Sequence, residues 1–310
     1  MNPFRFGVSV WHAPSRAEWI AKARKIEDLG YSSLLVPDHL NERVAPMPAL
    51  ISAAEATKRI RVGTYVLNND LRHPVVVARE AAAVDLFTDG RLQLGPGAGW
   101  NKAEYDQAGL TFDRGGIRVE RLAEAVVIIR RLLAGEQVTF AGRHYRVSGH
   151  VIAPLPVQKP HPPILIGGNG PRMLTPAAQQ ADIVGLAGMT PRRGGTEMDV
   201  SRWKGSAVDE SIALIRAAAG ERFARLELNA LVQRVVVSDD RRGAAEDLTR
   251  AWPQLGAADI LETPYVLIGT VDQIVEDLCA YRARWCISYY VVHEPYMDAF
   301  APVVARLAGK

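Results

Sequence analysis

The stretch from Arg61 to Asn101 constrains the fold more than any other part of the sequence. An apolar, β-rich run over 62–67 predicts a strand buried on both faces, and Pro74 suits the first turn of the helix that follows. A second strand over 91–94 leads directly into a glycine-rich segment. Strand, helix and strand in this order predict a β-α-β unit of a parallel sheet, and both strands end in loops of the kind that face ligands.

Strand and helix patterns alternate along nearly the whole chain. Apolar or β-rich runs predict strands over 4–10, 33–36, 62–67, 91–94, 164–166, 183–186, 226–237 and 288–292. Strands that alternate with helices in a chain of 310 residues predict an α/β fold, a (β/α)8 TIM barrel. A doubly wound sheet is the alternative, but two such domains would need a linker, and no segment of the sequence resembles one.

Two segments interrupt this alternation, and we interpret both as insertions in a single domain that spans residues 1–310. Residues 138–147 have the pattern of a short β-hairpin, within an insertion near 136–150. Residues 190–206 are polar, contain glycine and are long for a connection, which favours a lid-like loop at the barrel mouth.

Composition limits the partners that the chain is expected to have. The 37 basic and 34 acidic residues give a formal charge of +3 without any basic cluster, so we expect a small-molecule substrate and no nucleic acid. No run reaches the roughly 18 apolar residues of a membrane span, and the N-terminus lacks the pattern of a signal peptide. The sequence therefore predicts a cytoplasmic protein. Its two cysteines, Cys279 and Cys286, are too few for a disulfide framework.

The segment Gly167-Gly168-Asn169-Gly170-Pro171-Arg172 follows the fifth predicted strand and leads into a helix. Backbone N–H groups at such a turn, backed by a helix N-terminus, form an anion site, and Arg172 adds a positive charge. The spacing fits neither a nucleotide P-loop nor a dinucleotide fingerprint. We expect a mononucleotide-like phosphate here, and a turn that binds nothing is the alternative.

Asp38 and His39 follow the second predicted strand, at the end of the barrel where active sites lie. A histidine at this position can act as an acid or a base near neutral pH. The alternative is that Asp38 caps a turn while His39 packs against neighbouring loops, and the sequence leaves both open.

Further aromatic and histidine side chains follow other strands and are candidates for a substrate pocket. They are Trp11, His12, Trp100 and His293. No pair of histidines has the spacing of a metal site, so no metal is expected.

Several blocks of this sequence are similar to the bacterial luciferase-like oxidoreductase superfamily. They are FGVSV, LLVPDHL, the long block from VGTYVLNND to GWNKAEYDQAGL, and PPILIGGNGPRML. The closing SYYVV and APVVARLAG are similar as well, so the resemblance covers almost the whole chain. Within the superfamily the chain most resembles the branch that uses the deazaflavin coenzyme F-420 (F420).

The resemblance implies a barrel with the flavin-type ring near its mouth. It assigns catalysis to His39, close to the ring, with Asp38 beside it, and it implies a non-proline cis peptide around Leu67-Asn68-Asn69. The cofactor-binding residues that it implies are Leu67, Asn68, Asn69, Gly97, Ala98, Gly167, Gly168, Asn169, Gly170, Arg172, Gly188, Met189 and Thr190. The sugar-phosphate dehydrogenases of this superfamily have a catalytic glutamate after the fourth strand, where this chain has Ala98, so a glucose-6-phosphate reaction is in doubt.

The expected function is hydride transfer between F420 and a small organic substrate. An FMN-dependent luciferase-like monooxygenase on the same fold is one alternative, and a non-catalytic flavin-binding barrel is another. The resemblance also implies a homodimer.

Overall fold

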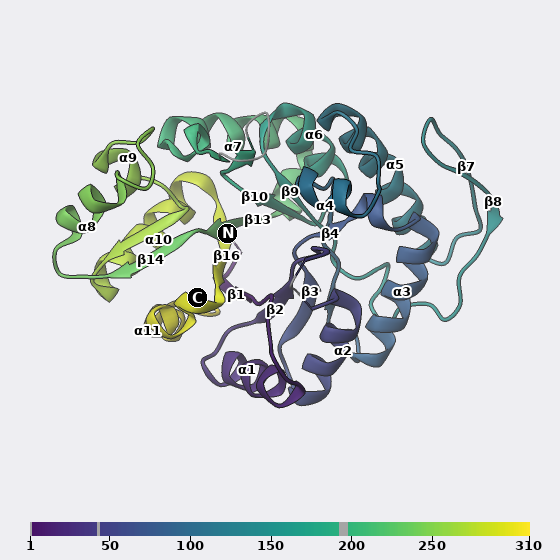
Figure 1. Cartoon of the computed structure of the whole chain (residues 1–310), viewed down its shortest axis with the longest axis horizontal. Coiled ribbons are helices and arrows are strands. Elements are labelled where there is room, and N and C mark those ends of the chain that lie inside the picture. The colour runs from purple at the N-terminus through teal and green to yellow at the C-terminus, as the bar shows by residue number, and fades with distance from the viewer. Residues whose placement is uncertain (1, 42–43, 192–197) are drawn as a thin grey trace.

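The computed structural model describes residues 2–41, 44–191 and 198–310. Its main sheet has eight strands, in the order β5 (Leu92–Gln93), β3 (Arg61–Thr64), β2 (Ser33–Val36), β1 (Arg5–Ser9), β16 (Ile287–His293), β13 (Glu227–Val232), β10 (Ile183–Leu186) and β9 (Leu165–Gly168). All neighbouring pairs are parallel. The edge strands meet at a parallel bridge between Leu94 and Ile164, which nearly closes the barrel. The predicted TIM barrel is confirmed, and the doubly wound alternative is excluded (Figure 1).

Helices surround the strands on the outside (Figure 1). The longer ones are α1 (Arg16–Asp28), α2 (Pro46–Ala56), α3 (Pro74–Phe87), α5 (Gly115–Leu133), α6 (Gly170–Gln180), α7 (Gly205–Ala219), α10 (Val271–Trp285) and α11 (Met297–Leu307). Shorter ones are α4 (Lys102–Gln107), α8 (Arg241–Leu248) and α9 (Ala257–Leu261). Their starts follow local signals: Thr270 and Gln273 form a capping box at the start of α10. No helix in the described ranges has the combined length and apolarity that crossing a bilayer requires.

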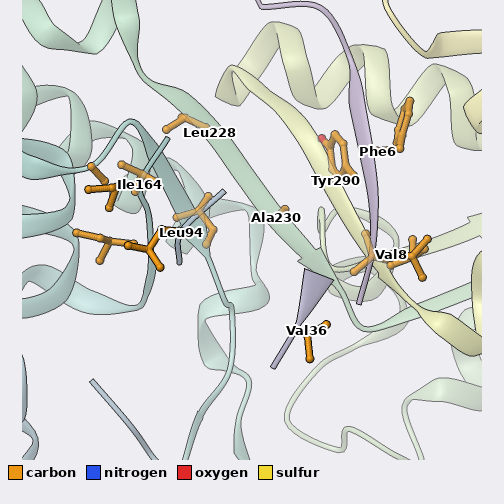
Figure 2. Packing of buried hydrophobic residues seen from close by; sticks show 14 of the residues in the cluster. Phe6, Val8, Val36, Leu94, Ile164, Leu228, Ala230 and Tyr290 are labelled. Atoms are coloured by element: carbon orange, nitrogen blue, oxygen red, sulfur yellow. The ribbon is translucent and has the colours of Figure 1, made fainter. Parts of the chain in front are cut away.

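Side chains of each barrel strand alternate between the helices and the barrel interior. Phe6 and Val8 of β1 and Tyr290 of β16 belong to the large buried cluster between strands and helices (Figure 2). Tyr289 and Val291, the intervening residues of β16, belong to a second cluster inside the barrel. Because parallel strands bury both faces, these runs are apolar throughout, and that pattern made them predictable from sequence.

The predicted hairpin is confirmed as β7 (Val138–Ala141) paired antiparallel with β8 (Arg146–His150). Of the predicted lid-like loop, 192–197 lie outside the described residues. The flanking parts form the short antiparallel pair β11 (Thr190–Pro191) and β12 (Met198–Asp199), followed by the 3-10 helix η2 (Ser201–Trp203). Trp203 is fully buried against Trp252 and Tyr265, so this end of the segment is part of the core.

The single strand predicted over 226–237 is wrong, because the structure divides it at Gln233. β13 stays in the barrel, whereas β14 (Arg234–Val237) leaves it and pairs in parallel with β15 (Val266–Gly269), a strand that was not predicted. The backbone N–H of Gln233 donates to the carbonyl of Tyr265 at 2.7 Å, where the chain changes partner. The third strand is also shorter than predicted: β3 ends at Thr64, and Leu67–Asn68 form a separate short strand, β4, beside β6 (Pro96–Gly97).

Candidate active site

The segment after β3 contains a cis non-proline peptide between Tyr65 and Val66. The resemblance had implied such a bond around Leu67-Asn68-Asn69, and the bond lies directly before Leu67, close to the expected position. A Cβ atom on Gly97 would lie 2.2 Å from Cγ2 of Val66, a distance that no real side chain tolerates. Glycine at this position lets the segment that follows β5 pack directly against the bulge at Tyr65–Val66.

The Asn68-Asn69-Asp70 loop is held by side chains from three other segments. The Tyr105 hydroxyl lies 3.0 Å from Oδ1 of Asn68, and Arg121 pairs with Asp70 at 2.8 Å. Nδ2 of Asn69 donates to the Tyr145 hydroxyl of the hairpin insertion at 3.0 Å. Burial raises the pKa of Tyr105, so its hydroxyl stays protonated and can donate. The loop that sequence reasoning placed near the cofactor is therefore fixed in position.

Asp38 is buried and makes its contacts with this loop and not with the His39 ring. Its carboxylate accepts from the backbone N–H of Asn68 at 3.0 Å and pairs with Arg72 at 2.6 Å. Each of these bonds ties the end of β2 to the segment after β3. Asp38, a candidate catalytic residue from the sequence, therefore has its carboxylate engaged by Arg72 and by the backbone of Asn68.

His39 lies beside the buried carboxylate of Glu104. Nδ1 of His39 is 2.7 Å from Oε1 of Glu104, which is only 5% exposed. The ring also meets the edge of Trp100, with centroids 5.7 Å apart. Within the described ranges Nε2 of His39 has no hydrogen-bond partner. This nitrogen is therefore open to a ligand, as an acid–base group requires.

Sequence reasoning missed Glu104. It lies in α4, a helix of six residues, too short to give a periodic signal. The resemblance had drawn attention to Ala98, which stands where the sugar-phosphate dehydrogenases have a glutamate, and the carboxylate that meets His39 comes from Glu104, six residues further along the chain. Ala98 itself lies nearby, where its carbonyl accepts from Nε of Arg118 at 3.2 Å.

The loop between β9 and α6 has the features of an anion site. Asn169 precedes the helix, but its side chain makes no capping bond there. Instead its Oδ1 accepts from the N–H of Gly188 at 3.0 Å and its Nδ2 donates to the carbonyl of Met189 at 2.7 Å. Asn169 thus joins the loops after β9 and β10, and its side chain leaves uncapped the first-turn amides of α6, the groups that bind an anion at a helix N-terminus. Gly170 begins the helix with φ +71°, and Arg172 is exposed in the first turn.

The predicted substrate-pocket residues lie at two places. Trp11 and His293 are neighbours, with ring centroids 5.1 Å apart, whereas Trp100 belongs with His39 and is 45% exposed. The His12 side chain is exposed, and its carbonyl accepts from Lys22. The structure therefore places Trp100 directly beside His39, and Trp11 and His293 near the ends of β1 and β16.

A surface hollow of about 430 Å³ lies elsewhere, between α7 and α10. It is lined by Asp209, Arg216, Arg284 and Trp285, among others. Trp285 ends α10 directly before β16 begins, so this hollow lies toward the opposite end of the strands from His39. We place the candidate site at His39 because an imidazole, the carboxylate of Glu104 and the ring of Trp100 lie together there.

Comparison with known proteins agrees with this fold. The sequence model of the luciferase-like monooxygenase family matches residues 2–261, and the chain belongs to that family. It is an oxidoreductase of the luciferase-like class.

Individual relatives within the family differ in their chemistry. The chain is 29% identical to an F420-dependent glucose-6-phosphate dehydrogenase of Nakamurella multipartita over 303 residues, 92% of this chain and 84% of the relative. It is 27% identical to the 4-hydroxyprotoasukamycin monooxygenase of Streptomyces nodosus subsp. asukaensis over 297 residues, 87% and 76% of the two chains. The solved structure of the coenzyme F420-dependent tetrahydromethanopterin reductase of Methanopyrus kandleri has the same fold, with a TM-score of 0.77 at 18% identity over 99% and 98% of the two chains.

Proposed function

We propose that this protein is a coenzyme F420-dependent oxidoreductase that transfers a hydride between the cofactor and a small organic substrate. The observation that carries the proposal is His39, which lies in the loop after β2 with Nδ1 bonded to Glu104 and Nε2 without a partner among the described residues. The relative from Nakamurella multipartita, which shares most of its length with this chain, supports the choice of F420.

The residues at the mouth fit such a cofactor. The open first-turn amides of α6, with Gly167, Gly168 and Arg172 around them, would hold its phosphate. The Val66 bulge and the fixed Asn68-Asn69 loop would face its ring. When bound, F420 exchanges a hydride with a substrate carbon, so the protein must orient the substrate and handle the accompanying proton.

The chain's own residues supply these functions. Nε2 of His39 takes or gives the proton, and Trp100 provides an apolar wall beside it. Asp38 keeps the loops after β2 and β3 together through Arg72 and Asn68.

The second candidate is an FMN-dependent monooxygenase, and the relative from Streptomyces nodosus subsp. asukaensis favours it. FMN also carries a phosphate, so the same α6 loop would accept it. A non-catalytic flavin-binding barrel is the third candidate, and it would bind a cofactor without turning over any substrate. The His39–Glu104 pair argues against the third, because simple binding does not require an open acid–base nitrogen.

By resemblance to its family, we include in the proposal that the chain acts as a homodimer in the cytoplasm. Light scattering on the purified protein measures the mass of the assembly directly. A mass near that of one 33.9 kDa chain would contradict the dimer.

The test is a fluorescence titration of purified apoprotein with oxidised F420 and, in parallel, with FMN. We expect saturable binding of F420 and much weaker binding of FMN. Tighter binding of FMN would overturn the cofactor assignment and make oxygen consumption the next assay. If neither compound binds, the anion site at α6 is only a turn, and the proposed function falls with it.

A further inference from the structure

We propose that Glu104 is a positioning residue that fixes His39 in the tautomer with its proton on Nδ1. Nε2 is then the basic nitrogen of the site. This inference rests on the proposed function for its catalytic meaning, but the tautomer is a property of the protein alone.

The surroundings of Glu104 determine which atom carries the proton. Its Oε1 accepts from Nδ2 of Asn101 at 2.7 Å, and its Oε2 lies 3.4 Å from the backbone N–H of Leu40. Both neighbours are donors, which is the environment of an ionised carboxylate that only accepts. No arginine or lysine pairs with Glu104 within the described ranges. The atom of His39 that lies 2.7 Å away must therefore be an N–H.

A neutral imidazole carries one proton. If that proton is on Nδ1, Nε2 has a free lone pair. In water the opposite tautomer is slightly favoured, so the protein has to select this one. When a substrate hydroxyl is oxidised to a carbonyl, its O–H proton moves to Nε2 and its C–H hydride leaves for the cofactor. Glu104 then lies against the imidazolium that forms, and in the reverse reaction Nε2 returns the proton.

Asp38 precedes His39 in the sequence but cannot serve this purpose. Its two oxygens are engaged by Arg72 and by the N–H of Asn68. The described part of the chain shows no contact between this carboxylate and the His39 ring. The ring partner comes instead from α4, far along the chain.

The direct test is heteronuclear NMR of the histidine ring nitrogens in apoprotein, with the His39 signals assigned from their loss in His39→Ala. We expect Nδ1 protonated and Nε2 bare in the wild type. Glu104→Ala should move the population toward the Nε2–H tautomer, whereas Glu104→Gln, whose amide oxygen can still accept, should largely retain the original one. Glu276→Gln, an exposed substitution on α10, is the matched control. A wild-type ring protonated on Nε2, or a Glu104→Ala spectrum unchanged from wild type, would overturn the inference.

The catalytic consequence is measured separately, with F420 and its substrate. Glu104→Ala should lower kcat by roughly 10- to 100-fold while KM and the cofactor Kd change less than about threefold, and Glu104→Gln should recover much of the loss. Equal losses in cofactor binding and kcat would indicate a merely structural role and overturn the inference. Because the NMR test needs no cofactor, its outcome stands even if F420 proves to be the wrong one, so failures of the two proposals can be told apart.

Discussion

Buried polar side chains lie at both ends of the barrel, and the two ends use them differently. At the floor, where the strands begin, side chains pair with side chains of other strands: Arg5 bonds Glu227 at 2.8 Å and Gln93 at 3.1 Å, and Ser33 bonds Tyr289 at 2.6 Å. At the mouth, where strands end, Asp38 and Asn169 also bond the backbone of neighbouring loops, and Asp38 pairs with the Arg72 side chain as well.

This difference separates stability from function. The floor contacts bind strands of the barrel to one another, although among the described residues Nε2 of Gln93 is buried without a hydrogen-bond partner. The mouth network holds loops in place, and one of its members, His39, has its outer nitrogen open. Substitutions at the mouth should therefore change turnover or cofactor binding, or loosen the loops, whereas substitutions at the floor should change only the free energy of unfolding.

Replacing His39 with Ala removes the open acid–base group. We expect kcat to fall by roughly 10²- to 10⁴-fold with the Kd for F420 changed less than threefold, because the side chain acts on a proton and not on cofactor binding. Steady-state kinetics and fluorescence titration measure the two quantities. His150→Ala, in the hairpin insertion, is the control. Unchanged turnover in His39→Ala would remove His39 from the mechanism.

Replacing Asp38 with Asn leaves Arg72 without its carboxylate. The amide has one acceptor in place of two, while both Arg72 and the Asn68 N–H still need a partner. We expect the free energy of unfolding to fall by about 1–3 kcal/mol, measured by urea denaturation. Asp106→Asn, which breaks an exposed pair with Lys102, should change it by less than about 1 kcal/mol. Equal effects would mean that burial of the Asp38 pair is unimportant.

Replacing Asn169 with Ala cuts the link between the loops after β9 and β10. We expect the Kd for F420 to rise roughly tenfold, about 1.4 kcal/mol, with kcat nearly unchanged. Gln179→Ala, exposed near the far end of α6, should leave the Kd as it is. If Asn169→Ala binds F420 as tightly as the wild type, the phosphate does not depend on this loop.

Replacing Glu227 with Gln tests how a carboxyl at the floor contributes to stability. Burial raises the pKa of Glu227 above its ordinary value, against the opposing effect of Arg5 and Arg61. The native carboxyl then binds a proton more readily than the unfolded one, so stability falls as the pH rises from the ordinary glutamate pKa to the native pKa.

That fall should be missing in Glu227→Gln, and kcat should stay near its wild-type value. Urea melts across this pH range measure it, with Glu276→Gln as control. If stability falls equally with pH in the wild type and in Glu227→Gln, other groups cause the pH dependence.

The barrel could be predicted from the sequence because its strands are buried on both faces. The run Ser33–Val36 is apolar enough to be identified with its bounds unchanged. β15 was missed although Val266–Gly269 is also apolar, because it pairs only with β14 outside the barrel. At Gln233 the chain leaves the barrel, and its backbone bonds there to Tyr265, which is far along the sequence. No local sequence pattern reveals such a contact.

The site was only partly predictable, for the same reason. His39 was predicted as a site residue because it follows the end of a strand. The glycine-rich loop before α6 was predicted from its composition. Tertiary packing determines which carboxylate contacts His39. The neighbour in sequence, Asp38, pairs with Arg72, whereas Glu104 contacts His39 from a helix of six residues. The cis peptide lies at Tyr65–Val66, a position that the resemblance gave only approximately.

The measurement that tests the central claim most directly is turnover of the F420-loaded enzyme with and without oxygen, using a panel of alcohols, imines and enones. Hydride transfer predicts that the cofactor changes its redox state at the same rate in both conditions and that the product gains no oxygen atom from O2. A reaction that stops when oxygen is removed, or a product that carries oxygen from O2, would contradict the account and identify a monooxygenase.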